Sequence, residues 1–364
     1  MSVSAPVAPA PRQWTTRPMA VHLVGTAPLG SGGHPLSTMQ WHLDHQHGVP
    51  LTALPFDTDD RWIIDWLEER EDVPGLVKVR TGTSLGYDDL SYYVIGDGHV
   101  LSPADLALGR VEQTATAFAS REHLRGGSKA PERLQVSIPN ALDLAFFVSG
   151  SVEASAEWIG AMQTMLDGEI GEIADRWGDR VQLQLESPAI LLAYHRTPRE
   201  DWPLLTAELA EQVATTLAAA PSARWVLHLC YGDLEHQPLF EPNDLVAPVT
   251  FLNALADLLD TRGVPMPLVH LPIAHGSAAP ATDPAFYAAL RELRRGVEVI
   301  AGVVDENHPD ATRLAFALLI DALGGPVTAL GASCGLGRRS AVAGAANTAL
   351  ASSVARAWTT TSAR

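Results

Sequence analysis

Short apolar segments alternate with longer amphipathic segments along most of this chain. We predict strands at the apolar segments Ala20–Gly25, Leu51–Pro55, Leu134–Ile138, Val181–Leu185, Arg224–Cys230, Pro267–Leu271, Val297–Val304 and Val327–Leu330. The stretches between them show helical periodicity, and we predict helices at Leu204–Ala219, Leu245–Asp260, Pro284–Arg295, Ala311–Leu323 and Ala341–Trp358. Strands that alternate with helices in this way indicate βαβ units and a parallel sheet.

The number of strands distinguishes two α/β architectures. About eight strands fit a single (β/α)8 barrel of the TIM type better than an open doubly wound sheet. An early GxGxxG motif, typical of dinucleotide-binding folds, is absent. We therefore predict a barrel over residues 18–364, preceded by a disordered arm over 1–17. Residues 56–130 fit the repeat worst and are predicted to be an insertion after the second strand, covering the barrel mouth.

Composition narrows the classes of function. The 364 residues contain 25 Lys and Arg against 42 Asp and Glu, for a net charge of −17, and 46% are hydrophobic. The absence of a basic cluster argues against binding to nucleic acid or anionic lipid. The chain has neither an apolar run long enough to cross a bilayer nor an evident secretory signal, so we expect a cytoplasmic protein without membrane contact. Two cysteines exclude a disulfide framework, and the oligomeric state stays open.

Candidate metal ligands lie where three late strands end. His228 and Cys230 are two residues apart and therefore point to the same side of one strand, His270 lies on the next strand, and Cys334 follows the last. Adjacent late strands of a barrel would bring these side chains together. One imidazole and two thiolates with an exchangeable fourth ligand form a catalytic zinc site, which lowers the pKa of a bound thiol. His270 is the candidate fourth ligand; an ordinary buried histidine is the alternative.

Several segments resemble one known family. They are VGTAP (24–28), LQLESPA (183–189), HLCYGD (228–233), VIAGVVDENHPD (299–310) and CGLGRR (334–339). In this order they resemble motifs of the zinc-binding barrel of cobalamin-independent methionine synthase, and the chain has the size of single-barrel members of that superfamily.

The resemblance implies a zinc-dependent transferase that moves an alkyl group, typically methyl, to a substrate thiol held as a zinc-bound thiolate. It implies zinc ligands at His228, Cys230 and Cys334, substrate-binding residues at Gly25, Thr26, Glu186 and Asp233, and catalytic roles for Asp305 and His308. The implied partners are a small-molecule thiol and an alkyl donor, which is a folate, a corrinoid or an electrophilic small molecule.

The chain also departs from the family. The strand after His228-x-Cys230 has His270 in place of the family's Glu ligand, and Glu186-Ser187 replaces an acidic pair. His308 is displaced by one position from the family's histidine, and a His-Gly-Glu substrate motif is not found. Homocysteine is therefore not assigned as the substrate. Two alternatives stay open: a transferase or lyase that joins an epoxide or other electrophile to a thiol, and a non-catalytic barrel stabilised by zinc.

The role of Glu186, at the end of its strand, has two possible explanations. Its charge suits the ammonium group of a substrate, whereas the alternative is an ion pair with a protein group such as Arg196. A metal-free decarboxylase of the uroporphyrinogen-decarboxylase type would leave the His-x-Cys and Cys-Gly-Leu motifs unexplained.

Overall fold

The structure is a computed structural model that describes residues 18–59, 61, 63–86, 89–126 and 130–362. The arm predicted over residues 1–17 lies outside the described residues.

Parallel strands form a closed barrel in the described part of the chain. Its eight strands are β1 (Ala20–Val21), β2 (Leu54–Pro55), β5 (Leu134–Pro139), β6 (Val181–Ser187), β7 (Arg224–Leu229), β8 (Leu268–Pro272), β9 (Val299–Val304) and β10 (Ala329–Ala332), with spatial order β1-β10-β9-β8-β7-β6-β5-β2. The Val21 N–H donates to Pro50 O (2.8 Å) and the Thr52 N–H donates to Val21 O (3.1 Å), which joins β1 to the chain entering β2 and closes the ring. The predicted (β/α)8 fold is confirmed.

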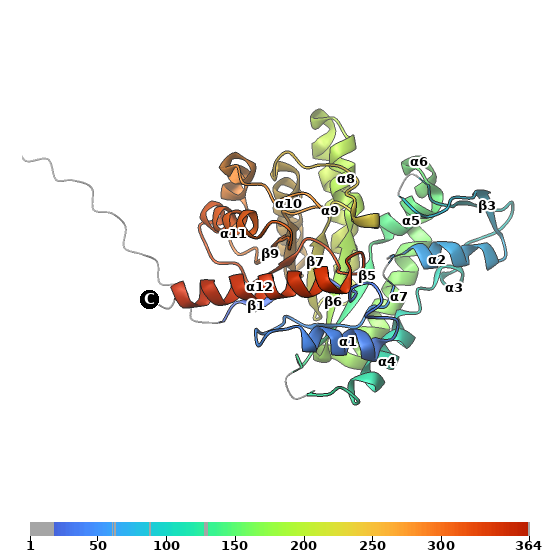
Figure 1. The fold of residues 1–364 in the computed structure, drawn as a ribbon. Coiled ribbons are helices and arrows are strands. Elements are labelled where there is room, and N and C mark those ends of the chain that lie inside the picture. Colours follow the sequence, from blue (N-terminus) through green and yellow to red (C-terminus); the bar gives the residue numbers. More distant parts are fainter. Residues whose placement is uncertain (1–17, 60, 62, 87–88, 127–129, 363–364) are drawn as a thin grey trace, which may run out of the picture.

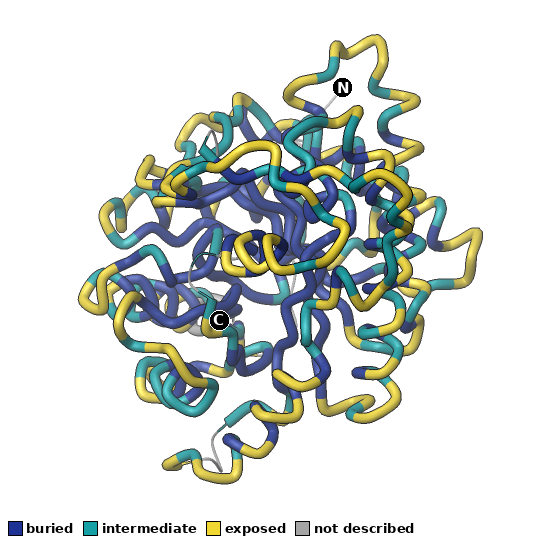
Figure 2. Tube along the Cα trace, turned by 90° about the vertical axis from the view of Figure 1, so that its right-hand side faces the viewer, coloured by how far each residue is buried: buried dark blue, intermediate teal, exposed yellow. Residues whose placement is uncertain are grey.

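Helices surround the strands (Figure 1). They are α1 (Pro35–Asp44), α4 (Arg110–Arg121), α5 (Ala141–Ser149), α6 (Val152–Ser155), α7 (Ile159–Trp177), α8 (Pro188–Arg196), α9 (Trp202–Ala218), α10 (Val246–Arg262), α11 (Pro309–Leu323) and α12 (Ala341–Ser362). The sequence supplies their ends: the Asn140 side chain accepts the Leu142 N–H at the start of α5, and Gly263 and Gly324 adopt positive φ after α10 and α11. Buried residues form the centre of the molecule and exposed residues its periphery (Figure 2).

One predicted helix has a different form. The segment Pro284–Glu292 is a 3-10 helix, and not the α-helix predicted over Pro284–Arg295. Tyr287, Leu290 and Leu293 are three residues apart and all pack against the core. A helix with three residues per turn aligns such a spacing on one face, whereas an α-helix would rotate it away.

The insertion after β2 is shorter than predicted. It contains α2 (Ile64–Glu69), a 3-10 turn (Arg70–Asp72), the antiparallel pair β3 (Leu76–Arg80) and β4 (Tyr92–Ile95), and α3 (Pro103–Leu106). Helix α4 lies within the range predicted as insertion, but it packs against α1, α7 and β5 as a helix of the barrel. Figure 1 shows β3 and α2 projecting to one side of the barrel.

The barrel interior contains both apolar and polar side chains. Val226, Leu268, Ile300 and Ala329 form a buried apolar cluster inside it. Closer to the carboxyl ends of the strands, His22, Gln184, His228 and His270 are all buried. Every one of these polar side chains needs a hydrogen-bond partner inside the barrel.

Among the described residues, no helix is both long enough and apolar enough to cross a membrane.

Substitution of Gly331 tests the close packing of β10 against the segment that follows β1. A Cβ at this position would lie 2.2 Å from the backbone oxygen of His22, which belongs to the neighbouring strand segment. We expect Gly331→Ala to lower the free energy of unfolding by about 1–3 kcal/mol, because backbone cannot yield as a flexible side chain does. Denaturant unfolding measures the change. The control is Gly168→Ala, in an exposed part of α7 with open space at the Cβ, where stability should be unchanged or rise by up to about 1 kcal/mol. Equal stability of Gly331→Ala and the parent chain would contradict the prediction.

Candidate metal centre

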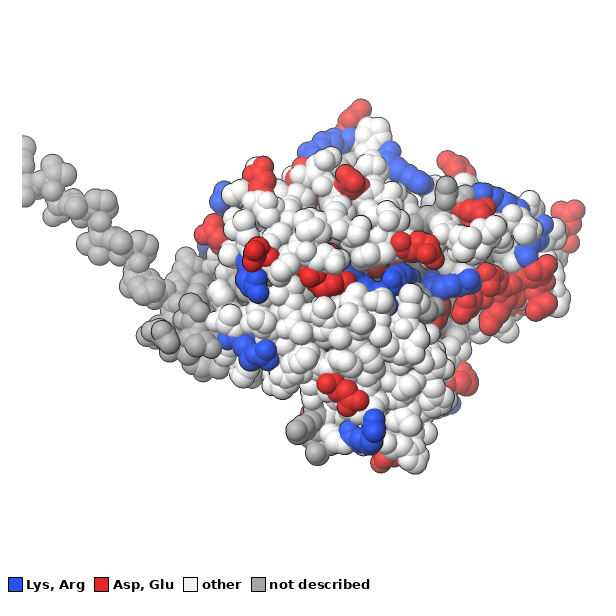
Figure 3. Space-filling view, in the orientation of Figure 1, with Lys and Arg blue, Asp and Glu red and all other residues white. Residues whose placement is uncertain are grey.

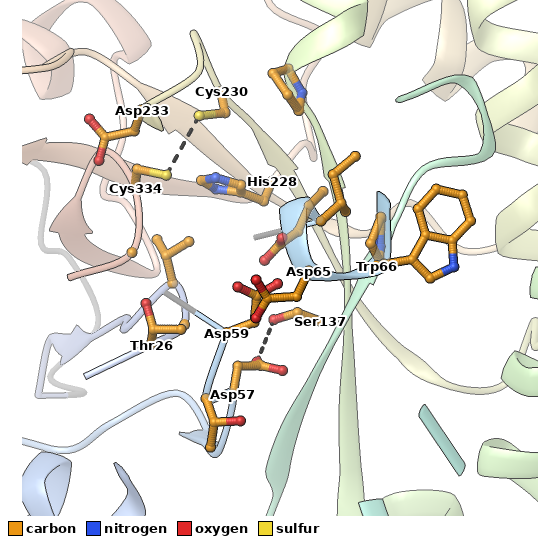
Figure 4. Close-up of a pocket in the computed structure, with 18 of the residues that line it drawn as sticks. Thr26, Asp57, Asp59, Asp65, Trp66, Ser137, His228, Cys230, Asp233 and Cys334 are labelled. Atoms are coloured by element: carbon orange, nitrogen blue, oxygen red, sulfur yellow. Dashed lines mark hydrogen bonds between the residues drawn. The ribbon is translucent and has the colours of Figure 1, made fainter. Parts of the chain in front are cut away.

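A cavity of about 360 Å³ lies at the carboxyl ends of the barrel strands, where barrel enzymes place their active sites. The predicted site residues that line it are Gly25, Thr26, Glu186, His228, Cys230, Asp233 and Cys334. The insertion contributes a further wall that includes Asp57, Asp59, Asp65 and Trp66 (Figure 4). Segments more than 300 residues apart in the chain therefore share one cavity.

His228, Cys230 and Cys334 form a cluster at one side of this cavity (Figure 4). Each offers one ligand atom, and these atoms lie within 4.8 Å of one another, with 3.7 Å between the two sulfurs. His228 is on β7 and Cys230 follows that strand, so the two-residue spacing places both on the same side. Cys334 follows β10, which is separated from β7 by β9 and β8 in the order of the strands.

A chain of hydrogen bonds sets the tautomer of His228. The His270 Nε2 lies 2.9 Å from the carbonyl oxygen of Ala332, and its Nδ1 lies 2.9 Å from Nδ1 of His228. A carbonyl oxygen accepts only, so His270 carries its proton on Nε2 and accepts at Nδ1. His228 must then donate from Nδ1, which leaves the lone pair of its Nε2 for a ligand. This is the arrangement that a metal-binding histidine requires.

This assignment of the tautomers applies to neutral imidazoles, and burial favours the neutral form of both rings. Burial lowers the pKa of His270 to about 4. Burial, with the neighbouring His270, also holds the pKa of His228 well below its ordinary value. Gly302 makes room for the inner ring, because a Cβ there would lie 2.7 Å from Cε1 of His270.

The two cysteines would need a bound cation to carry negative charge together. A hydrogen bond with the Cys334 sulfur, together with burial, raises the pKa of the Cys230 thiol well above its ordinary value. Two adjacent thiolates without a counter-charge are therefore unfavourable, and a bound divalent cation reverses this balance. The Gly232 N–H donates to the Cys230 sulfur (3.2 Å), which suits a sulfur that carries negative charge.

A buried ion pair holds the Cys334 loop in place. Arg339 donates from Nε to Glu306 Oε1 (3.0 Å) and from a terminal nitrogen to the Gly335 carbonyl (3.2 Å). The Asn347 side chain donates to the other oxygen of Glu306 (2.8 Å). Glu306 and Arg339 thus tie the loop after β10 to the end of β9.

Glu186 lies at the cavity with only 8% of its surface exposed. Gln184 Nε2 donates to Glu186 Oε1 (2.8 Å) and to the Val24 carbonyl (2.6 Å). The Gln184 oxygen in turn pairs with His22 Nε2 (2.9 Å), and His22 Nδ1 pairs with the Thr52 hydroxyl (2.8 Å). Sequence reasoning missed Gln184 and His22. The available signal was a polar residue at alternate positions of strands that are otherwise apolar.

The predicted site residues His270, Asp305 and His308 are not among the described residues that line the cavity. His270 lies behind His228, with both ring nitrogens engaged as described above. Asp305 Oδ1 accepts the backbone N–H of His308 and pairs with that residue's Nδ1 (2.9 Å), at the start of α11. Arg196, the protein cation considered for Glu186, lies with its guanidinium over the ring of Phe146.

Comparisons with known proteins show the fold. Neither a scan against protein-family models nor a search of the curated proteins finds a match. Among solved structures, the chain is similar to a B12-independent methionine synthase from Shewanella sp. W3-18-1 in complex with selenomethionine, with TM-score 0.58, 11% identity and coverage of 95% of this chain and 100% of that chain. It is also similar to a methyltransferase from Methanosarcina mazei, with TM-score 0.52, 10% identity and coverage of 92% and 93%. At these identities the likeness shows a shared barrel fold.

A second carboxyl group lies behind Glu186. Asp143, on α5, is fully buried; its oxygens accept the Ser187 hydroxyl (2.5 Å) and the Ala189 N–H (2.7 Å). Burial raises the pKa of Asp143 to about 8, despite these hydrogen bonds, and the nearby charge of Glu186 adds to the rise.

Asp143 makes the protein less stable as pH rises from acidic to neutral values. The folded-state pKa is above the unfolded one, so the contribution is fully present below about pH 4 and is lost as pH rises through about 8. The loss amounts to at most about 1.4 kcal/mol per pH unit within that window. We expect Asp143→Asn, which keeps the size and an acceptor, to flatten the curve of unfolding free energy against pH between 4 and 8. A slope identical to that of the parent chain would contradict this.

Proposed function

We propose that this protein is a zinc-dependent transferase that moves an alkyl group, typically methyl, to the sulfur of a small-molecule thiol. The observation that carries the proposal is the His228, Cys230 and Cys334 cluster, which lies in a cavity at the catalytic end of the barrel. The barrel fold shared with a B12-independent methionine synthase and a methyltransferase supports it.

The donor set fits zinc. A Zn–S bond of about 2.3 Å in tetrahedral geometry separates two sulfurs by about 3.8 Å. The sulfurs of Cys230 and Cys334 are 3.7 Å apart, and the hydrogen-bond chain leaves Nε2 of His228 unprotonated. These three residues would hold the ion, and His270 would position His228 from behind, since its own nitrogens are engaged.

A structural zinc site is closed by four protein ligands, whereas a catalytic site keeps one position for substrate. Of the residues that the structure describes, three form the ligand group, and they face the cavity. This arrangement favours catalysis over the non-catalytic barrel. The epoxide alternative concerns the same cavity and the same thiol, and differs in the electrophile.

Zinc, when bound, would lower the pKa of a substrate thiol so that it reacts as a thiolate at neutral pH. In the substitution, the sulfur forms a bond to the alkyl carbon while the bond from that carbon to its donor breaks, and the electron pair leaves with the donor. Glu186 would orient an ammonium group of the thiol substrate. The protein walls would limit the access of water, and Asp305 with His308 would hold the loop at the end of β9.

Metal content tests the ligand set. We expect protein purified without added metal to contain about one zinc per chain, and Cys230→Ser and Cys334→Ser to lose most of it, because each removes one of the few soft ligands. Elemental analysis measures the zinc, and X-ray absorption at the zinc edge should show one added sulfur ligand when a substrate thiol binds. His275→Ala, in a loop outside the ligand group, is the control that keeps its zinc. Full zinc content in both cysteine variants would refute the proposed ligands.

Glu186→Gln tests the recognition of an ammonium group. A charge-assisted hydrogen bond contributes about 1.5–3 kcal/mol, so binding of an amino thiol should weaken about 10- to 150-fold. Titration calorimetry measures this loss on samples of equal zinc content, and a thiol without an amino group should bind both proteins alike. If the variant instead loses stability and keeps its affinity for amino thiols, Glu186 has a structural role.

A further inference from the structure

Strand β6 presents a row of polar side chains to the interior of the barrel. Its valine and two leucines belong to the large hydrophobic cluster that includes helix residues, and the polar residues alternate with them: Gln182, Gln184 and Glu186. Alternate residues of a strand point to opposite faces, so these three side chains share the inner face. The charged side chains in view in Figure 3 lie on the outer surface, whereas this buried inner row has two neutral amides and one carboxylate.

Two glutamine side chains hold the segment that follows the first strand. Strand β1 ends at Val21, and Leu23 and Val24 continue the chain outside any strand. Gln135 Nε2 donates to the carbonyl oxygens of Leu23 and Val24 (2.8 Å each), and Gln184 Nε2 donates to that of Val24 (2.6 Å). These amides therefore fix the segment that leads directly into Gly25 and Thr26, which line the cavity.

The hydrogen bonds around Gln184 have one consistent direction. Its Nε2 faces the carbonyl oxygen of Val24, which only accepts, and also donates to Oε1 of Glu186 (2.8 Å). Its oxygen must accept, so His22 donates from Nε2 (2.9 Å). Burial lowers the pKa of His22 to about 3, so the ring is neutral, and its Nδ1 accepts the proton of the Thr52 hydroxyl (2.8 Å).

Thr52, His22, Gln184 and Glu186 form one network, which we call the Gln184 network. It begins at a hydroxyl next to β2 and ends at a carboxylate that lines the cavity. The same amide of Gln184 holds the segment before Gly25 and the carboxylate of Glu186 at fixed relative positions. A carboxylate that is held in this way loses less rotamer freedom when it binds a ligand.

We propose that Gln184 is a positioning residue for recognition of the ammonium group of the thiol substrate, and that His22 acts through Gln184. Gln184 holds the carboxylate of Glu186, and His22 holds the amide of Gln184. The proposal rests on the function proposed above, because the ammonium group belongs to the thiol substrate named there.

Two thiols of similar shape test the role of Gln184. Cysteamine carries an ammonium group where propanethiol has a methyl group, and titration calorimetry on zinc-loaded protein gives the ratio of their dissociation constants. We expect Gln184→Met to reduce the preference for cysteamine about threefold to tenfold, because one hydrogen bond to Glu186 is lost. Affinity for propanethiol and zinc content should stay unchanged.

Gln182→Met is the matched control. Gln182 is buried as completely as Gln184 and lies on the same face of β6, but its side chain bonds to Gln135 (3.2 Å) and Arg224 (3.3 Å). Loss of a buried amide destabilises both variants. Only the loss of a positioning residue lowers the preference for cysteamine, so Gln182→Met should keep the preference of the parent protein.

Variants of His22 test whether it acts through Gln184. His22→Gln keeps a terminal N–H for the Gln184 oxygen and should keep the preference, whereas His22→Met removes this donor and should reduce the preference about twofold to fivefold. The double variant His22→Met/Gln184→Met should lose no more than Gln184→Met alone. Additive losses would overturn the role assigned to His22.

Heteronuclear NMR of the parent protein with isotopically labelled histidine tests the network without substrate. We expect the neutral tautomer of His22 with its proton on Nε2, assigned by the loss of its signals in His22→Gln. A proton on Nδ1, or an imidazolium, would overturn the Gln184 network even if the variants at position 184 do not fold.

An unchanged preference for cysteamine in Gln184→Met, in protein that holds zinc and binds both thiols, would overturn this proposal and leave the proposed function intact. A parent protein that holds zinc and binds neither thiol would refute the proposed function, while the Nε2–H tautomer of His22 would still support the Gln184 network.

Discussion

The site depends on one hydrogen-bond chain, which runs from the Ala332 carbonyl through His270 to His228. Because a carbonyl oxygen can only accept, each nitrogen along the chain has a fixed role. The chain ends at His228, whose Nε2 keeps its lone pair, and the two cysteine sulfurs belong to the same ligand group. Gly302 leaves the space that the His270 ring occupies, because a Cβ there would lie 2.7 Å from Cε1 of that ring.

The barrel and the insertion form different walls of the cavity. Strands β7 and β10 present the three candidate ligands on a rigid frame, and the Arg339–Glu306 pair holds the loop of Cys334 against that frame. The insertion contributes Asp57, Asp59, Asp65 and Trp66 to the lining of the same cavity. The barrel strands and the insertion therefore line one cavity together, as the loops of barrel proteins commonly do at this end of the strands.

Two residues that depart from the family's motifs have specific hydrogen-bond partners in this structure. His270 stands where the family has a charged ligand, and it serves as a neutral neighbour that orients His228. Ser187 stands where the family has a carboxylate, and its hydroxyl donates to the buried Asp143 from the next helix. Both replacements leave the surroundings of the three candidate ligands less negative than the family's motifs would.

The sequence by itself determined the order of the strands and most of their bounds to within about two residues, because alternation of apolar and amphipathic segments reflects local periodicity. Residue spacing and strand ends predicted that His228, Cys230, His270 and Cys334 converge, and the family resemblance implied the three that lie around one point, His228, Cys230 and Cys334. The sequence did not predict the 3-10 form of Pro284–Glu292, the true end of the insertion, or the roles of Gln184 and His22. The 3-10 segment packs against α10 and α11, and helix α4 packs against α1 and α7. His22 contacts Gln184 from the far side of the sequence, and only the closed barrel brings them within hydrogen-bonding distance. Local periodicity contains none of these tertiary contacts.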